Sequence, residues 1–147
     1  MKRINQYRKL FNVDGDIDLA ELKKSYRNLV KEWHPDKHTA DDTHKQEAEE
    51  MSRLITDGYA FLQSIAPETI AKGLDEYNNT IDNAFIDDLK HKSLLLEITF
   101  TDGATYEYFG VNKNLFSKLI NADKMQRFAR RNIFNSFTYR KSKRTVE

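Results

Sequence analysis

The fold of the first half of the chain is decided by residues 22–37, which read LKKSYRNLVKEWHPDK. The apolar residues of this stretch recur at the three- and four-residue spacing of a helix with one apolar face. They are Leu22, Tyr26, Leu29, Val30 and Trp33. Pro35 disfavours helical backbone in the residue before it, so we predict that the helix ends near His34. A polar loop over residues 34–42 follows.

A basic face is predicted on the other side of the same helix. At about 100° per residue, four cations fall together, opposite the apolar residues. They are Lys23, Lys24, Arg27 and Lys31. Such a stripe is usually no more than a solvated face. Here, however, it runs into the His34-Pro35-Asp36 loop, which Lys37 follows.

Two further helices complete the predicted first half. A short one ends near Asn12, and Asp18 with Glu21 forms a capping box for the helix described above. The third runs from about residue 43 to residue 65 and should pack antiparallel to the second. Gly58 lies on its apolar stripe, where a missing side chain allows another helix to approach closely, although glycine costs a helix about 1 kcal/mol relative to alanine. The stripe consists of Ala48, Met51, Leu54, Ile55, Gly58, Leu62 and Ile65.

These features resemble the J-domain family of co-chaperones, over residues 4–66. The closest part is Leu22 to Leu29 together with Trp33-His34-Pro35-Asp36-Lys37, and the later helix pattern is echoed by Ile55, Tyr59 and Leu62. Gly58 stands where the family commonly has alanine. The chain lacks a glycine- and phenylalanine-rich linker and a cysteine-rich zinc domain after this segment, which suggests the class that keeps only the J domain.

The resemblance implies that the chain binds a DnaK-type chaperone ATPase and stimulates its ATP hydrolysis. The basic face and Tyr26 would meet an acidic surface of that partner. Asp36 would bond polar groups at the seam between the partner's nucleotide domain and its linker, while His34 and Pro35 hold the loop in shape. ATP and magnesium would bind the partner, so this chain needs no cofactor of its own.

Other interpretations of the same loop remain open. His34-Pro35-Asp36 is also compatible with an ordinary turn. His34, Asp36, His38 and His44 are metal-ligand types, but their spacing matches no metal motif. A catalytic His-Asp pair needs a nucleophile and a cleft, and the sequence shows neither. We therefore expect that the chain is not an enzyme.

The last third changes to a strand pattern. Leu94, Leu96, Ile98 and Phe100 alternate with other residues, the Asp102-Gly103 turn follows, and residues 105–109 form the returning strand. Two helices are predicted around Leu115 to Ala122 and Met125 to Ala129, followed by a short strand at residues 137–139. The predicted fold class is α+β, with a J domain at residues 1–66, a helical linker at 67–93 and a small α+β domain at 94–147. In the linker, Ile81, Phe85, Ile86 and Leu89 suggest an amphipathic helical turn.

Residues 94–141 resemble the KTSC domain, a small module named for its occurrence in some lysyl-tRNA synthetases. The resemblance is carried by residues 96–100, by Tyr106-Glu107-Tyr108-Phe109-Gly110-Val111 and by the ending Phe137-Thr138-Tyr139. It indicates a fold more than an activity.

The C-terminal part carries a basic bias. Residues 94–147 contain 10 Lys and Arg against 5 Asp and Glu. Candidates for binding a nucleic acid or a client protein are Arg127, Arg130, Arg131, Arg140 and Lys141. Aromatic residues beside such cations can stack on bases. The alternative is that Phe128, Phe134, Phe137 and Tyr139 form the core and the charges only face solvent.

Composition excludes several other classes. There is no cysteine, which excludes disulfides and thiolate metal sites and fits a reducing compartment. No apolar run has the length that a bilayer requires. The residues after Lys2 and Arg3 are too polar for a signal peptide. We expect a cytoplasmic protein with no membrane partner.

Overall fold

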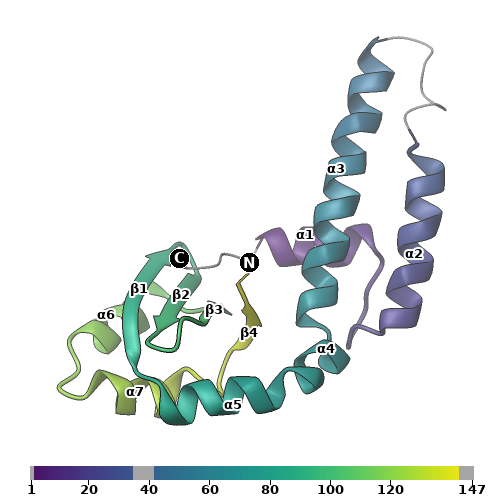
Figure 1. Cartoon of the computed structure of the whole chain (residues 1–147). Coiled ribbons are helices and arrows are strands. Elements are labelled where there is room, and N and C mark those ends of the chain that lie inside the picture. The colour runs from purple at the N-terminus through teal and green to yellow at the C-terminus, as the bar shows by residue number, and fades with distance from the viewer. Residues whose placement is uncertain (1, 35–41, 143–147) are drawn as a thin grey trace. The chain divides into compact units, whose positions relative to one another are not determined.

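The computed structural model describes residues 2–34 and 42–142. The chain divides into two compact units, residues 2–69 and residues 70 onward. The first is helical, and the second combines helices with a four-stranded antiparallel sheet (Figure 1). This confirms the predicted α+β class.

The helical unit contains α1 (Lys2–Leu10), α2 (Leu19–Glu32) and α3 (Asp42–Ile65). Asp18 caps α2 as predicted, because its side chain accepts hydrogen bonds from the backbone N–H groups of Ala20 and Glu21 at 2.9 and 3.1 Å. The helix ends at Glu32, two residues before His34. Figure 1 shows α2 and α3 side by side, running in opposite directions, as predicted.

The core of this unit lies between α3 and the apolar sides of α1 and α2. Ala48, Ile55 and Leu62 of α3 are fully buried, as their spacing predicts. Gly58 is also buried, and a Cβ atom there would lie only 2.9 Å from Cδ1 of Tyr7 and 3.0 Å from Cε2 of Phe11. The predicted close helix approach at Gly58 is therefore confirmed.

In the described residues, the second unit contains one sheet, the whole of three helices and part of a fourth. α4 (Pro67–Lys72) begins at Pro67 and crosses the boundary between the units, and α5 (Leu74–Asn83) follows Gly73. The strands are β1 (Ile86–Lys92), β2 (Leu95–Phe100), β3 (Thr105–Phe109) and β4 (Thr138–Lys141), in the spatial order β1-β2-β3-β4. Between β3 and β4 lie α6 (Lys113–Ile120) and α7 (Met125–Asn132).

The core of the second unit covers one face of its sheet. Leu96, Ile98 and Phe100 alternate along β2 and are at most 1% exposed. α5, α6 and α7 supply Tyr77, Ile81, Leu119 and Ala129 to the same cluster. The predicted alternation is thus confirmed for these three residues, whereas Leu94, which was predicted with them, precedes β2 and is 37% exposed. The three helices share one side of the sheet.

Four tyrosines are packed together within this core: Tyr77, Tyr106, Tyr108 and Tyr139. The rings of Tyr77 and Tyr139 stack with centroids 3.9 Å apart. The Tyr77 hydroxyl donates to the backbone oxygen of Phe134 at 2.5 Å and lies 2.9 Å from the Tyr108 hydroxyl, which then donates to it. Burial raises the pKa of the Tyr106 phenol to about 12 and raises the pKa values of the other three above their ordinary value.

The predicted helical linker at residues 67–93 needs correction. Its first part is helical, but residues 86–92 form β1, an edge strand of the sheet. A β-bulge between Ile86 and Asp88 inserts one residue, so that Ile86 and Leu89 both face the core although they are three residues apart. The bulge gave this strand the spacing of a helix.

Candidate functional site

The basic face of α2 is exposed as predicted. Lys23, Lys24, Arg27 and Lys31 are all exposed, whereas Leu22, on the other side of the helix, is 2% exposed. Val30 was predicted to face the core but is 37% exposed. It lies only about 20° around the helix from Lys23, at the margin of the apolar stripe.

The orientation of α2 is fixed by an aromatic stack. The ring of Tyr26 stacks on that of Tyr59 in α3, with centroids 4.2 Å apart and an interplanar angle of 16°. Phe11 packs on Tyr59 in turn, with centroids 6.5 Å apart. Tyr26 is half-buried. Because one side of α2 is held in this way, its cations face away from α3.

The corner that follows α2 is described only as far as His34, whose side chain is exposed. Pro35, Asp36 and Lys37 lie outside the described residues, so their placement stays a prediction. Asp36 and His38 of the alternative metal site lie there as well. Within residues 2–34 and 42–142, no group of three or more His, Asp and Glu side chains is arranged to hold a metal ion.

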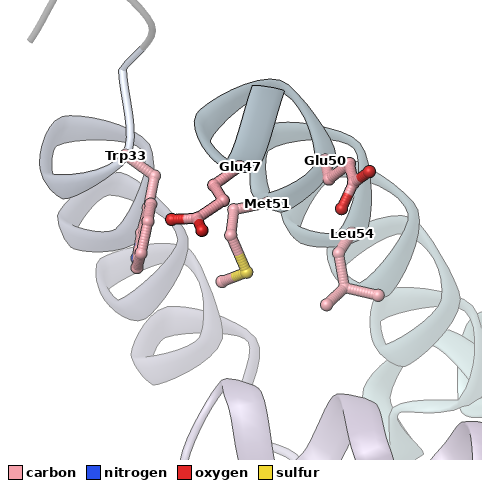
Figure 2. Close-up of a pocket in the computed structure, with 5 residues that line it drawn as sticks. All are labelled: Trp33, Glu47, Glu50, Met51 and Leu54. Atoms are coloured by element: carbon pink, nitrogen blue, oxygen red, sulfur yellow. The ribbon is translucent and has the colours of Figure 1, made fainter. Parts of the chain in front are cut away.

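A groove beside this corner was not predicted. It measures about 460 Å³ and lies between the end of α2 and the first half of α3 (Figure 2). Its lining residues are Trp33, Glu47, Glu50, Met51 and Leu54. Figure 2 shows the Trp33 ring facing Glu47 and Met51 across the gap between the two helices.

The five cations predicted in the second unit do not form one surface. Arg127, Arg130 and Arg131 are all exposed, but Arg130 donates to the backbone oxygen of Ile81 at 3.1 Å. Arg140 lies 3.4 Å from Glu107, and the next residue, Lys141, pairs with Glu76. Successive side chains of a strand point to opposite faces, so Arg140 and Lys141 lie on different sides of β4.

The aromatic residues interleaved with these cations belong to the core. Phe134 is fully buried, Tyr139 stacks on Tyr77, and Phe128 and Phe137 pack against the buried cluster. They therefore present no platform on which bases could stack.

Comparison with known protein families agrees with this geometry. Residues 6–68 match the model of the DnaJ domain, which is the J domain, and residues 88–137 match that of the KTSC domain. The chain carries a J domain and a KTSC domain. Both resemblances are confirmed, and the KTSC match begins within β1, in agreement with its place in the sheet.

Several proteins named Chaperone protein DnaJ are similar to the J domain. That of Thermoplasma acidophilum is 43% identical over 56 residues, 38% of this chain and 14% of the relative. That of Thermotoga maritima is 36% identical over 61 residues, 42% of this chain and 16% of the relative. That of Mesomycoplasma hyopneumoniae is 36% identical over 72 residues, 48% of this chain and 19% of the relative. The chain thus spans less than a fifth of the length of these relatives.

In the J domain and in the KTSC domain alike, none of the helices that the structure describes combines the length and apolar character needed to cross a bilayer.

Proposed function

We propose that this chain is a J-domain co-chaperone that binds a DnaK-type chaperone and stimulates its ATP hydrolysis. The observation that carries the proposal is the placement of Lys23, Lys24, Arg27 and Lys31 on the solvent side of α2, which leads directly to His34. The match to the J-domain family supports the same role.

The basic face of α2 serves encounter and orientation. Exposed cations that gather on one side of a helix attract an acidic surface on the partner and accelerate association, with a strong dependence on salt. The stack of Tyr26 on Tyr59 keeps this side turned outward. Because the helix is already folded and held in place, binding the partner does not have to supply the free energy of ordering it.

The His34-Pro35-Asp36 corner selects the active state of the partner. A module that binds the hydrolysis-competent conformation more tightly than the resting one shifts the partner toward hydrolysis. The chemistry stays in the partner, which holds ATP and magnesium, and this chain contributes no catalytic group and no cofactor. The absence of cysteine fits the cytoplasm as the site of this activity.

The test is a single-turnover ATPase assay with a purified DnaK-type chaperone and the full chain. We expect acceleration by the natural chain and none by His34→Gln. Acceleration of equal size by both would contradict the proposal.

Two charge-reversal variants separate the effect of the basic face on stimulation from the effect of the net charge of the chain. Arg27→Glu should raise the concentration needed for half-maximal stimulation about five- to tenfold, which corresponds to about 1 kcal/mol. Arg53→Glu makes the same change of charge at an exposed position of α3 and should leave this concentration unchanged. Equal effects of the two reversals would show that α2 is not the contact surface.

A further inference from the structure

The exposed side of α7 in the KTSC domain gathers three cations. Around this helix, Lys124, Arg127 and Arg131 lie within about 60° of one another, and all are exposed. Ala129 and Ile133 lie on the opposite side and are fully buried.

α7 is held firmly by its inner side. Gln126 accepts a hydrogen bond from the backbone N–H of Ile86 at 3.0 Å and donates to the backbone oxygen of Ala84 at 3.1 Å. Arg130 donates to the backbone oxygen of Ile81 at 3.1 Å. These bonds join α7 to α5 and to the start of β1. The three outer cations are therefore presented on a helix whose rotation is fixed.

The segment of the chain that carries α7 is strongly basic. Residues 110–142 contain eight basic residues and a single acid, Asp123, in the turn before α7. Arg140 and Lys141 are paired with Glu107 and Glu76. In the described part of the chain, Lys124, Arg127 and Arg131 form no salt bridge. Arg140 and Lys141 are thus paired with acids of the fold, whereas the three cations of α7 face solvent without an acidic partner among the described residues.

We propose that this outer side of α7 binds the sugar-phosphate backbone of a nucleic acid without preference for base sequence. Cations one helical turn apart, such as Arg127 and Arg131, suit successive phosphate groups. Base readout is not expected, because the neighbouring aromatic rings are in the core. Insertion into a lipid surface is not expected either, because the apolar side of α7 is buried in the domain.

The expected binding is weak and depends strongly on salt. Each phosphate contact contributes about 0.7 to the negative slope of the logarithm of the association constant against the logarithm of salt concentration for single strands. Three contacts therefore predict a slope of about −2. Non-specific affinity of this kind lies in the range of about 10⁻⁴ to 10⁻⁶ M at physiological salt.

The test uses the full chain and a labelled oligouridine RNA, whose binding is followed by fluorescence anisotropy from low to physiological salt. The double variant Arg127→Ala/Arg131→Ala should bind more weakly and should flatten the slope by about 1.4, because two contacts are lost. The control Lys45→Ala/Arg53→Ala removes two exposed cations of α3 in the J domain, outside its basic face, and should bind as the natural chain does. Oligomers of another base and a DNA strand of equal length should bind with similar affinity.

Three results would overturn the proposal. The first is no binding at low salt, and the second is an equal loss in the α7 variant and in the J-domain control. The third is stronger binding to polyglutamate or to anionic lipid vesicles than to RNA, which would indicate an acidic protein or a membrane instead. The α7 variant should still stimulate the chaperone ATPase, so failure of this proposal is distinct from failure of the co-chaperone role.

Discussion

Gly58→Ala tests whether the close contact between α1 and α3 determines the stability of the J domain. In an open part of a helix, alanine is about 1 kcal/mol more favourable than glycine. At residue 58 the new Cβ atom would lie 2.9 Å from Cδ1 of Tyr7 and 3.0 Å from Cε2 of Phe11, both of which are buried. Overpacking of this kind costs about 1 to 3 kcal/mol. The free energy of unfolding should therefore fall by up to about 2 kcal/mol in spite of the better helix former.

The assay is urea denaturation followed by the fluorescence of Trp33, the only tryptophan in the chain and a residue of the J domain. A matched pair at the exposed neighbour, Asp57→Ala and Asp57→Gly, measures the preference for alanine where no side chain is in the way. Alanine should be the more stable of that pair by about 1 kcal/mol. If Gly58→Ala stabilised the domain by the same amount, the contact with Tyr7 and Phe11 would not constrain the fold.

The tyrosine cluster of the KTSC domain gives two further predictions. Tyr77→Phe removes the hydroxyl shared by Tyr108 and the Phe134 backbone and should lower the free energy of unfolding by about 1 to 3 kcal/mol, measured by urea denaturation with near-ultraviolet circular dichroism. Raised pH should destabilise the same domain, because burial lifts the pKa of Tyr106 to about 12 and those of its three neighbours above 10. The folded form then keeps protons that the unfolded form releases, so stability is full below about pH 10 and falls as the pH rises toward 12 and beyond. Tyrosinate absorbance that rose near pH 10 for all seven tyrosines, with no loss of structure, would refute this.

Periodicity predicted the J domain well because its helices are long and one-sided. α2 begins after its Asp18 cap and stops before Pro35, and both signals are local properties of the chain. The part that could not be predicted is the contact between elements. Nothing in the sequence shows that the ring centroids of Phe61 and Tyr7 lie 5.5 Å apart, or that Trp33 and Met51 leave a groove between them.

The edge strand β1 shows why a regular pattern can mislead. A bulged strand places residues three apart on one face, which is also the spacing of a helix. The pairing that resolves the ambiguity lies in β2, where Leu89 meets Ile98 and His91 meets Leu96. These partners are only nine and five residues apart, because β1 and β2 form a hairpin closed by a two-residue turn at Ser93 and Leu94, where Ser93 has a positive φ of 56°. Neither residue is a usual signal for such a turn, so the linker prediction at residues 67–93 missed the hairpin.

The basic residues of the KTSC domain show that the sequence alone does not reveal which charges face solvent. A count of cations cannot separate Arg140, which lies beside Glu107 on a neighbouring strand, from Arg131, which faces solvent on α7. Only the cations that are unpaired within the fold can release counterions when a polyanion binds. The J domain and the KTSC domain therefore each present one solvent-facing basic helix, α2 and α7. Because both respond to salt, salt dependence alone cannot identify which helix a partner uses. Variants that remove the charges of one helix at a time can identify the helix. His34→Gln is a further variant, which should affect binding to the chaperone partner alone.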